Sequence, residues 1–295
     1  MWRQLVATVD QSDAETVSDW LERQAALSIS LDDAGDEPLF EPPVGETPLW
    51  HQVKVTALFD EQVPVESIGS ELERVFGGKV QALEIQTLED QVWERAWMAH
   101  FSPMSFGERL WICPTGFEPP EPDAVNVILD PGLAFGTGTH PTTALCLAWL
   151  DSLDLRGKTL LDYGCGSGIL AIAALCLGAV SATGIDIDPQ ALLASRDNAR
   201  KNGVLDRFDL HLAGSGDAGL HDVVVANILA GPLVELAPAM LSHLRPGGRI
   251  ALSGLLRDQA ELVMDAYRGE IDFDPIQVRD DWVLLSGIKT HPVSG

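Results

Sequence analysis

The stretch from residue 159 to residue 189 constrains the fold more than any other part of the chain. An apolar run that ends at Asp162 is typical of a buried strand, and the glycine-rich residues 164–168 indicate a tight turn after it. The apolar, alanine-rich residues 169–177 predict a helix, and a second apolar run ends at Asp186. The sequence therefore predicts a βαβ unit with a glycine turn after its first strand and a carboxylate after its second.

This unit has the form of a binding site for a nucleotide-like cofactor. Gly164 and Gly166 let the backbone approach a ligand, because glycine has no Cβ to collide with it. Asp186 follows the turn by roughly 20 residues, the spacing that brings a carboxylate to ribose hydroxyls. Residues 166–171 also fit the dinucleotide pattern that ends in alanine. Three alternatives follow: a nicotinamide dehydrogenase, a site for S-adenosylmethionine, and a turn that binds no ligand.

Asp162 favours S-adenosylmethionine over a dinucleotide. It stands just before the glycine turn, so a pyrophosphate bound there would meet a like charge. S-adenosylmethionine has no phosphate and carries an ammonium and a sulfonium group, both of which a carboxylate attracts. The spacing of Asp186 fits either cofactor, so the choice depends on Asp162.

The composition limits the class of protein. A length of 295 residues with 46% hydrophobic residues fits one large or two ordinary packed domains. The four cysteines form no CxxC pair and no metal-ligand spacing, which predicts free thiols, a cytoplasmic location and no metal site. No apolar stretch has the length of a membrane span, and no signal segment is visible. The net charge of −25 argues against a nucleic acid held by phosphate contacts; it favours a basic partner or serves solubility.

Residues 1–89 predict a small domain with the element order β-α-β-β-α-β, the ferredoxin-like arrangement. Alternating residues indicate strands and helical periodicity indicates helices, with Asp13 as the candidate cap of the first helix. The expected strands are 4–9, 27–31, 51–59 and 80–85, and the expected helices are 13–26 and 65–76. Because no catalytic motif falls in it, this domain is expected to recognise a substrate or to serve as a structural cap.

Residues 90–116 are expected to connect this domain to a doubly wound α/β domain at residues 117–295, in which strands and helices alternate. In the connector, residues 91–101 predict an aromatic helix and residues 110–113 a short strand. The second domain is expected to have strands at 126–129, 159–161, 182–185, 208–212, 221–226, 250–254, 276–278 and 282–286. The last two predict an antiparallel edge, which methyltransferases have and dehydrogenases do not require.

A loop rich in glycine and hydroxyl groups, residues 130–140, precedes a helix that begins near Pro141. We expect this loop to fold over the cofactor, which would bring Phe135 and Thr137 into the site, with the Thr143 hydroxyl within reach. The last residue of the loop, His140, is a candidate base, although a histidine in a polar loop more often makes a structural hydrogen bond.

Asn227 ends the strongly apolar strand 221–226, at the sheet edge where the glycine turn is expected. Its side-chain amide has both a donor and an acceptor. Beside a methyl donor, the amide oxygen can accept a hydrogen bond from an amine and aim the amine's lone pair. Asn227 is therefore the candidate catalytic residue.

Four motifs together resemble the ribosomal protein L11 methyltransferase (PrmA) family. They are residues 131–143 (Pro-Gly-Leu-Ala-Phe-Gly-Thr-Gly-Thr-His-Pro-Thr-Thr), 161–168 (Leu-Asp-Tyr-Gly-Cys-Gly-Ser-Gly), 184–189 (Gly-Ile-Asp-Ile-Asp-Pro) and 226–230 (Ala-Asn-Ile-Leu-Ala). The glycine turn is common to most S-adenosylmethionine-dependent methyltransferases, whereas the first and last motifs are far more specific. The resemblance covers the whole chain, because the N-terminal domain and the Trp-rich connector also look like that family.

The resemblance implies a Rossmann-like seven-stranded methyltransferase domain that transfers methyl groups from S-adenosylmethionine to lysine ε-amines and the N-terminal α-amine of ribosomal protein L11. It implies cofactor contacts at Thr143, Gly164, Asp186 and Asn227, and an N-terminal domain that grips the substrate and moves relative to the catalytic domain. We also expect a monomer that acts on L11 free of the ribosome, without direct contact to nucleic acid or a membrane.

Two other functions stay open. The chain is alternatively an S-adenosylmethionine-dependent N-methyltransferase of another amine or of a nucleic-acid base, because an asparagine at this strand end also suits base amines. The non-enzyme alternative is a ribosomal-protein binding or assembly module that keeps a cofactor site for stability. Comparing the binding of S-adenosylmethionine with the binding of NAD distinguishes a methyltransferase from a dehydrogenase. Measuring methyl transfer distinguishes an enzyme from a binding module.

Overall fold

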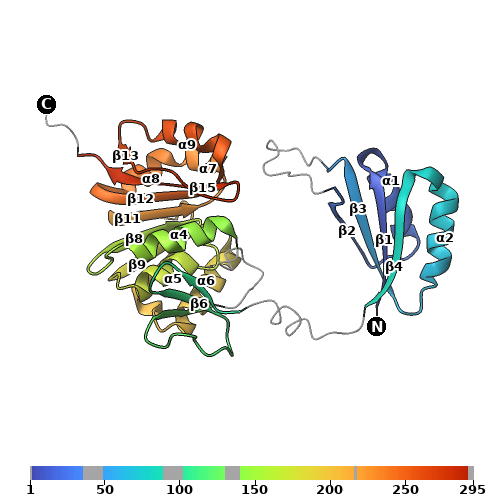
Figure 1. Ribbon diagram of the computed structural model, residues 1–295, viewed down its shortest axis with the longest axis horizontal. Helices are drawn as coiled ribbons and strands as arrows, with labels where there is room; N and C mark the ends of the chain where they lie inside the picture. The colour runs from blue at the N-terminus through green and yellow to red at the C-terminus, as the bar shows by residue number, and fades with distance from the viewer. Residues whose placement is uncertain (1, 36–48, 89–101, 130–139, 216–217, 292–295) are drawn as a thin grey trace. The chain divides into compact units, whose positions relative to one another are not determined.

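The computed structural model describes residues 2–35, 49–88, 102–129, 140–215 and 218–291. The chain divides into two compact units, Met1–Trp97 and Met98–Gly295 (Figure 1). The expected helix at 91–101 and the loop residues Phe135 and Thr137 lie outside the described residues.

In the first unit, a four-stranded antiparallel sheet carries both helices on one face. The elements are β1 (Trp2–Asp10), α1 (Gln11–Arg23), β2 (Ser28–Asp33), β3 (Gln52–Asp60), α2 (Val65–Phe76) and β4 (Val80–Leu88), in the sheet order β2-β3-β1-β4. Alternate residues of the central strand β1, Leu5, Ala7 and Val9, are fully buried and pack with both helices. The alternation of apolar and polar residues that predicted these strands therefore reflects a sheet that is covered by helices on one face only.

The first helix begins differently from the sequence prediction. Asp10 is the N-cap residue of α1 and makes no side-chain capping bond, while Asp13 lies inside the first turn. The Asp13 carboxylate accepts a hydrogen bond from Lys79 Nζ at 2.6 Å, so the prediction that Asp13 caps the helix is wrong. The Asp13 carboxylate therefore forms a salt bridge with Lys79 and does not bind the N–H groups of the helix.

A mixed sheet forms the centre of the second unit. Its hydrogen-bonded order is β10-β9-β8-β11-β12-β15-β13, and β14 pairs with β15. The strands are β8 (Thr159–Tyr163), β9 (Ser181–Asp186), β10 (Phe208–Leu212), β11 (His221–Asn227), β12 (Leu244–Leu256), β13 (Ile271–Phe273), β14 (Gln277–Arg279) and β15 (Trp282–Lys289). The pairs from β10 to β12 are parallel, and β15 is antiparallel to β12, β13 and β14.

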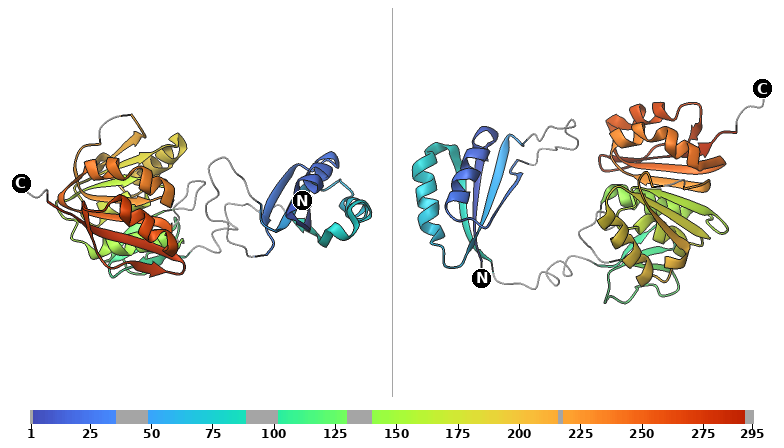
Figure 2. Two further views of the ribbon diagram at one scale, coloured as in Figure 1. Left: turned by 90° about the horizontal axis from the view of Figure 1, so that it is seen from above. Right: turned by 180° about the vertical axis from the view of Figure 1, so that it is seen from behind.

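Helices cover both faces of this sheet (Figures 1 and 2). They are α4 (Pro141–Ser152), α5 (Ile169–Cys176), α6 (Pro189–Lys201), α7 (Ala230–Glu235), α8 (Ala237–His243) and α9 (Ala260–Ala266). Leu160 packs with α4 and α5, whereas the next residue, Leu161, packs with α7 and α8 on the opposite face. Strands buried on both faces read as unbroken apolar runs, which is why the sequence predicted them well.

The strand order places the site. From β8, the chain builds one half of the sheet through β9 to β10, and β11 then returns to the other side of β8. The order therefore reverses between β8 and β11, and ligands of open α/β sheets bind at the carboxyl ends of strands at such a point. The glycine turn follows β8, and Asn227 is the last residue of β11.

Two sequence predictions about this unit are wrong. The sheet contains eight strands among the described residues instead of seven, because β13 adds to the predicted closing pair. The expected first strand, 126–129, is β7 (Val125–Ile128), and it belongs to a separate sheet with β5 (Met104–Phe106) and β6 (Leu110–Cys113). The side chain of Asn202, the residue that follows α6, holds β7: its amide donates to Ile128 O at 2.8 Å and accepts from Ile128 N at 2.7 Å.

Candidate active site

The turn after β8 exposes backbone instead of side chains, because three of its residues are glycines with positive φ. Gly164, Gly166 and Gly168 have φ values of +75°, +53° and +78°, a region that side chains disfavour. Two side chains of α6 hold the turn from behind: Ser195 Oγ donates to Gly166 O at 2.9 Å, and Asn198 Nδ2 donates to Ser167 O at 2.9 Å. No pattern in the sequence indicates these two supports, because they depend on the packing of α6 against the turn.

Asp186 ends β9 beside the turn, as the sequence predicted. Its Oδ2 accepts from Gly166 N at 2.8 Å and its Oδ1 from Asp188 N at 3.0 Å. A carboxylate has about four acceptor sites, so these two bonds leave capacity for ligand hydroxyls. Asp188 is the cap of α6 and accepts from Gln190 N at 2.8 Å, which confirms the prediction that its role is structural.

Asp162 is the most deeply buried carboxylate of the site, with 1% of its surface exposed. Its Oδ2 accepts from Ala171 N at 3.2 Å, and its Oδ1 has no hydrogen-bond partner among the described residues. Burial raises the pKa of Asp162 to about 7; the bond from Ala171 N opposes the rise and the charge of Asp186 adds to it. A buried oxygen without a partner is costly, so the residues present fit a cationic group placed beside Asp162.

Asn227 lies next to the turn, because β11 pairs with β8 at Ala226 and Tyr163. Its Nδ2 donates to Thr143 Oγ1 in the first turn of α4 at 3.1 Å. The following residue, Ile228, is confined on two sides: a Cβ at Gly164 would collide with its side chain, and one at Gly254 with its carbonyl. The structure thus brings Asn227 and Thr143 into contact, although they are far apart in the sequence and no local pattern links them.

His140 is the N-cap residue of α4. Its Nδ1 accepts from Thr142 N at 3.4 Å and lies 2.7 Å from Thr142 Oγ1, and its ring stacks edge-on against Trp282 at a centroid distance of 4.8 Å. Burial lowers the pKa of His140. His140 thus makes a structural hydrogen bond, the commoner role of a histidine in a polar loop, and a neutral ring is the form that can accept from the helix N–H group.

The cysteines offer no reactive thiolate, because burial raises the pKa of all four thiols. Cys146 and Cys165 are buried, and desolvation raises the pKa of each thiol, so both stay protonated and unreactive. Across the ranges that the structure covers, no group of three or more His, Cys, Asp and Glu residues is placed to hold a metal ion. In the same residues, no helix has the length and apolarity needed to cross a membrane.

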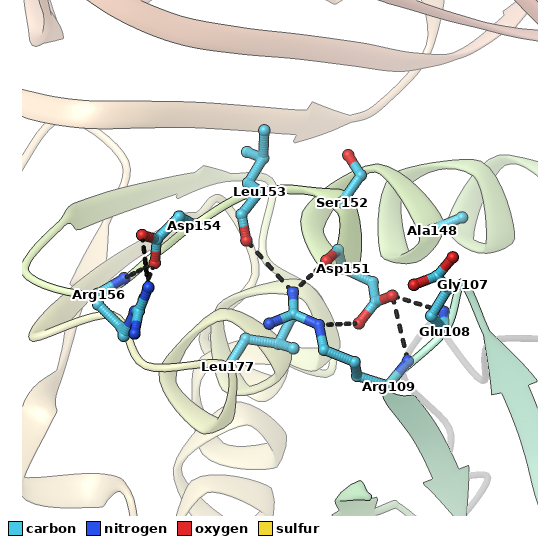
Figure 3. Close-up of a pocket in the computed structure, with 10 residues that line it drawn as sticks. All are labelled: Gly107, Glu108, Arg109, Ala148, Asp151, Ser152, Leu153, Asp154, Arg156 and Leu177. Atoms are coloured by element: carbon cyan, nitrogen blue, oxygen red, sulfur yellow. Dashed lines mark hydrogen bonds and ion pairs between the residues drawn. The ribbon is translucent and has the colours of Figure 1, made fainter.

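One cavity of the second unit lies away from the glycine turn. A cavity of about 700 Å³ opens at the C-terminal end of α4, and it contains none of the predicted site residues (Figure 3). Arg109 spans this end of α4: its Nε lies 3.3 Å from Asp151 Oδ1, and its guanidinium donates to the carbonyls of Asp151 and Leu153. Arg156 is likewise paired with Asp154, at 2.8 Å. Both arginines that line this cavity are therefore paired with carboxylates.

Comparisons with known proteins agree with the sequence pattern. The family model described as ribosomal protein L11 methyltransferase (PrmA) matches residues 1–290. A protein of that name from Methylococcus capsulatus is 54% identical over 98% of this chain and 99% of its own length, and one from Hahella chejuensis is 52% identical over 97% and 98%. A solved structure of ribosomal protein L11 methylase from Lactobacillus delbrueckii subsp. bulgaricus is 33% identical, with a TM-score of 0.58, over 65% of this chain and 100% of that chain.

Proposed function

The chain belongs to the ribosomal protein L11 methyltransferase (PrmA) family, and from this premise we propose that it transfers methyl groups from S-adenosylmethionine to amines of ribosomal protein L11. The acceptors in this proposal are lysine ε-amines and the N-terminal α-amine. The observation that carries it is the position of Asn227, whose amide ends β11 beside the glycine turn at the switch point of the sheet. An amide at this place suits an amine as the nucleophile.

The cofactor site in this proposal consists of Gly164, Gly166, Asp162, Asp186 and Thr143. The partnerless oxygen of Asp162 supports its assignment to the ammonium group, and the remaining acceptor capacity of Asp186 supports its assignment to the ribose. Bound S-adenosylmethionine supplies the methyl group on a sulfonium. Phe135 and Thr137 stay in the predicted site as residues of the loop that precedes α4.

Asn227 orients the acceptor amine. A lysine amine with a pKa of about 10.4 must first lose its proton, and a site partly screened from water favours the neutral form. The amine donates one N–H to Asn227 Oδ1, which turns its lone pair toward the methyl carbon. With S-adenosylmethionine bound, its sulfonium would release the methyl group and keep the electron pair of the C–S bond; the amine aligned by Asn227 would receive the methyl group and then lose a proton to water. Alignment of this kind is the enzyme's main contribution.

The first unit is the substrate-recognition part of the proposal. In this proposal a ferredoxin-like module, residues 1–89, is joined through a connector, residues 90–116, to a methyltransferase domain, residues 117–295, whose mixed sheet has eight strands among the described residues. We propose that the protein acts as a monomer in the cytoplasm on L11 that is free of the ribosome. The charge of −25 suits a basic protein substrate and opposes phosphate contacts.

The direct test is transfer of labelled methyl from S-adenosylmethionine to purified L11, with intact ribosomes and bare rRNA as parallel acceptors. Label in free L11, with none in RNA, supports the proposal, and mass spectrometry of the product identifies the amines. Label in RNA or in another amine, with none in L11, favours an N-methyltransferase of a different substrate. Binding of both cofactor and L11 without transfer favours the assembly module.

A further inference from the structure

An aromatic side chain of β15 packs against the N-terminal end of α4. The ring of Trp282, the first residue of β15, lies edge-on against the ring of His140, the N-cap residue of α4, with 4.8 Å between the ring centroids. One turn further along the helix, Thr143 contacts the side-chain amide of Asn227. Residues three apart lie on the same side of a helix, so Trp282 and Asn227 adjoin one side of α4 at neighbouring turns.

The register of the sheet places Trp282 at the same edge as Asn227. Strand β12 lies between β11 and β15 (Figure 1). Asn227 is opposite Ser253 of β12, and Trp282 is opposite Leu256, the last residue of that strand. The proposed cofactor residues lie on the other side of Asn227, at the ends of β8 and β9. Asn227 therefore stands between the proposed cofactor residues and Trp282.

The direction of methyl transfer gives this arrangement a meaning. A displacement at the methyl carbon requires the nitrogen to approach from the side opposite to the sulfur, with the reacting atoms aligned. With the cofactor at β8 and β9 and the amine at Asn227, the rest of the acceptor extends away from β8, toward β12 and β15. Trp282 lies on that side of Asn227, and its side chain is partly exposed.

An indole suits the side chain of a lysine in two ways. Its apolar surface packs against the methylene stem, and its π-face attracts an ammonium group within about 6 Å. The contact with His140 helps to hold the ring in place. Around Trp282, the exposed Asp280 and Asp281 outnumber Arg279, which is opposite Trp282 across the hairpin. The surroundings therefore attract a lysine that arrives as a cation.

We propose that Trp282 is an acceptor-binding residue that holds the side-chain stem of the target lysine and directs its amine to Asn227. This inference rests on the proposed function, because it assumes that a protein amine is the acceptor. It also separates the two kinds of acceptor. A lysine ε-amine is carried on a flexible four-carbon stem, whereas the N-terminal α-amine is attached directly to the backbone. Replacement of Trp282 therefore impairs transfer to lysine more than transfer to the N-terminus.

The test compares Trp282→Leu and Trp282→Phe in methyl transfer to L11, with the label at each amine quantified by mass spectrometry. Leucine keeps an apolar side chain without a π-face, and phenylalanine keeps a smaller π-face. We expect Trp282→Leu to lower kcat/KM about tenfold at lysine amines, chiefly through KM, and less than about threefold at the α-amine. Trp282→Phe is expected to recover most of this loss. Neither variant is expected to change the affinity for S-adenosylhomocysteine.

Phe273→Leu is the matched control. The ring of Phe273 in β13 also lies edge-on against another ring, that of Tyr267, with 6.5 Å between the centroids. Phe273 is opposite Gly287, near the other end of β15 from Trp282. The variant removes an aromatic contact of the same unit outside the proposed path of the acceptor, so transfer to both kinds of amine is expected to match the wild type.

A second measurement needs no methyl transfer. N-acetyl-lysine N-methylamide, titrated into the full chain saturated with S-adenosylhomocysteine, is expected to shift the indole N–H signal of Trp282 in ¹⁵N–¹H NMR spectra. The signal is assigned by its absence from spectra of Trp282→Phe. The corresponding alanine compound, which has neither stem nor amine, is expected to leave it in place. A wild-type chain that transfers no methyl to L11 refutes the proposed function, and this titration then decides the inference.

Two results would overturn the inference. One is an equal loss at lysine and at the α-amine in Trp282→Leu, since a general packing defect would act on both. The other is an indole signal of Trp282 that the lysine compound leaves in place, or that the alanine compound shifts equally. Where L11 takes label at one kind of amine only, the titration decides. A fall in affinity for S-adenosylhomocysteine as large as the fall in kcat/KM would assign Trp282 to the cofactor site instead.

Discussion

Replacement of Asp162 by asparagine should make the protein more stable at alkaline pH and weaken its hold on the cofactor. The carboxyl group is 1% exposed, and burial raises its pKa from the usual 3.8 to about 7. The folded state therefore binds the proton more tightly than the unfolded state does. The contribution of Asp162 to the free energy of unfolding is therefore greatest below about pH 4, falls as the pH rises from about 4 to about 7, and is constant above the folded-state pKa.

The magnitude follows from the size of this shift. Each pKa unit is equivalent to about 1.4 kcal/mol, so a rise of about three units costs the folded protein on the order of 4 kcal/mol at pH 8. Asparagine has nearly the same shape and carries no charge at any pH. Its amide oxygen can accept the bond from Ala171 N, and its NH₂ group takes the place of the partnerless oxygen. A buried unpaired NH₂ costs about 1–3 kcal/mol, but that cost is the same at every pH.

The assay compares urea unfolding of the wild type and of Asp162→Asn between pH 5 and pH 8, together with calorimetric titration of S-adenosylmethionine. The variant is expected to gain stability relative to the wild type as the pH rises, while its cofactor affinity falls because a neutral amide does not attract the ammonium group. Asp154→Asn is the control, because Arg156 lowers the pKa of that exposed carboxyl to about 2. The Asp154 carboxyl does not titrate between pH 5 and pH 8, so the pH dependence of stability is expected to match that of the wild type in this range.

A stability difference that stays constant from pH 5 to pH 8 would refute the reasoning, because it would mean that Asp162 has an ordinary pKa in the folded protein. A variant that gains stability and binds the cofactor as well as the wild type does would leave the raised pKa in place and remove Asp162 from the ligand site. Stability gained and affinity lost in the same variant is the signature expected of a strained functional group.

Three further predictions concern single residues. Asp186→Ala should weaken S-adenosylmethionine binding by about 1–3 kcal/mol in calorimetry, the loss of a charge-assisted hydrogen bond, and unchanged affinity would exclude Asp186 from the site. Asn227→Ala should lower turnover on L11 more than it lowers cofactor affinity; full activity would end its assigned role. Gly107→Ala should destabilise the second unit by about 1–3 kcal/mol in urea, since Gly107 has a φ of +76° and a Cβ there would collide with Asp151. Gly116→Ala, with a φ of +88° and open space around it, isolates the backbone part of that cost.

The sequence predicted the elements that have a strong local pattern. The glycine turn, the apolar runs on either side of it and the cap at Asp188 are local features, and each lies where it was expected. The family followed from four short motifs and is confirmed by matches over nearly the full length. The assignments of cofactor and substrate contacts to particular residues stay predictions.

The errors concern choices that no local pattern encodes. The run at 126–129 has the composition of a sheet strand, but the pairing that makes it β7 of a small separate sheet depends on β6 and on the side chain of Asn202, the residue that follows α6. Asp13 is a good capping residue by type, yet Lys79, far along the chain, binds its carboxylate. In both cases a distant partner decided between two locally acceptable states.

By itself, the amino-acid sequence determined the βαβ unit, the order of the elements in the first unit and the family, because periodicity, glycine placement and short motifs are properties of neighbouring residues. Only the tertiary structure decided which groups meet at the switch point of the sheet. It left one oxygen of Asp162 without a hydrogen-bond partner among the described residues, and it placed the amide of Asn227 against Thr143. Burial and hydrogen bonding between residues far apart in the chain set the charge of one and the contact of the other, and both depend on packing.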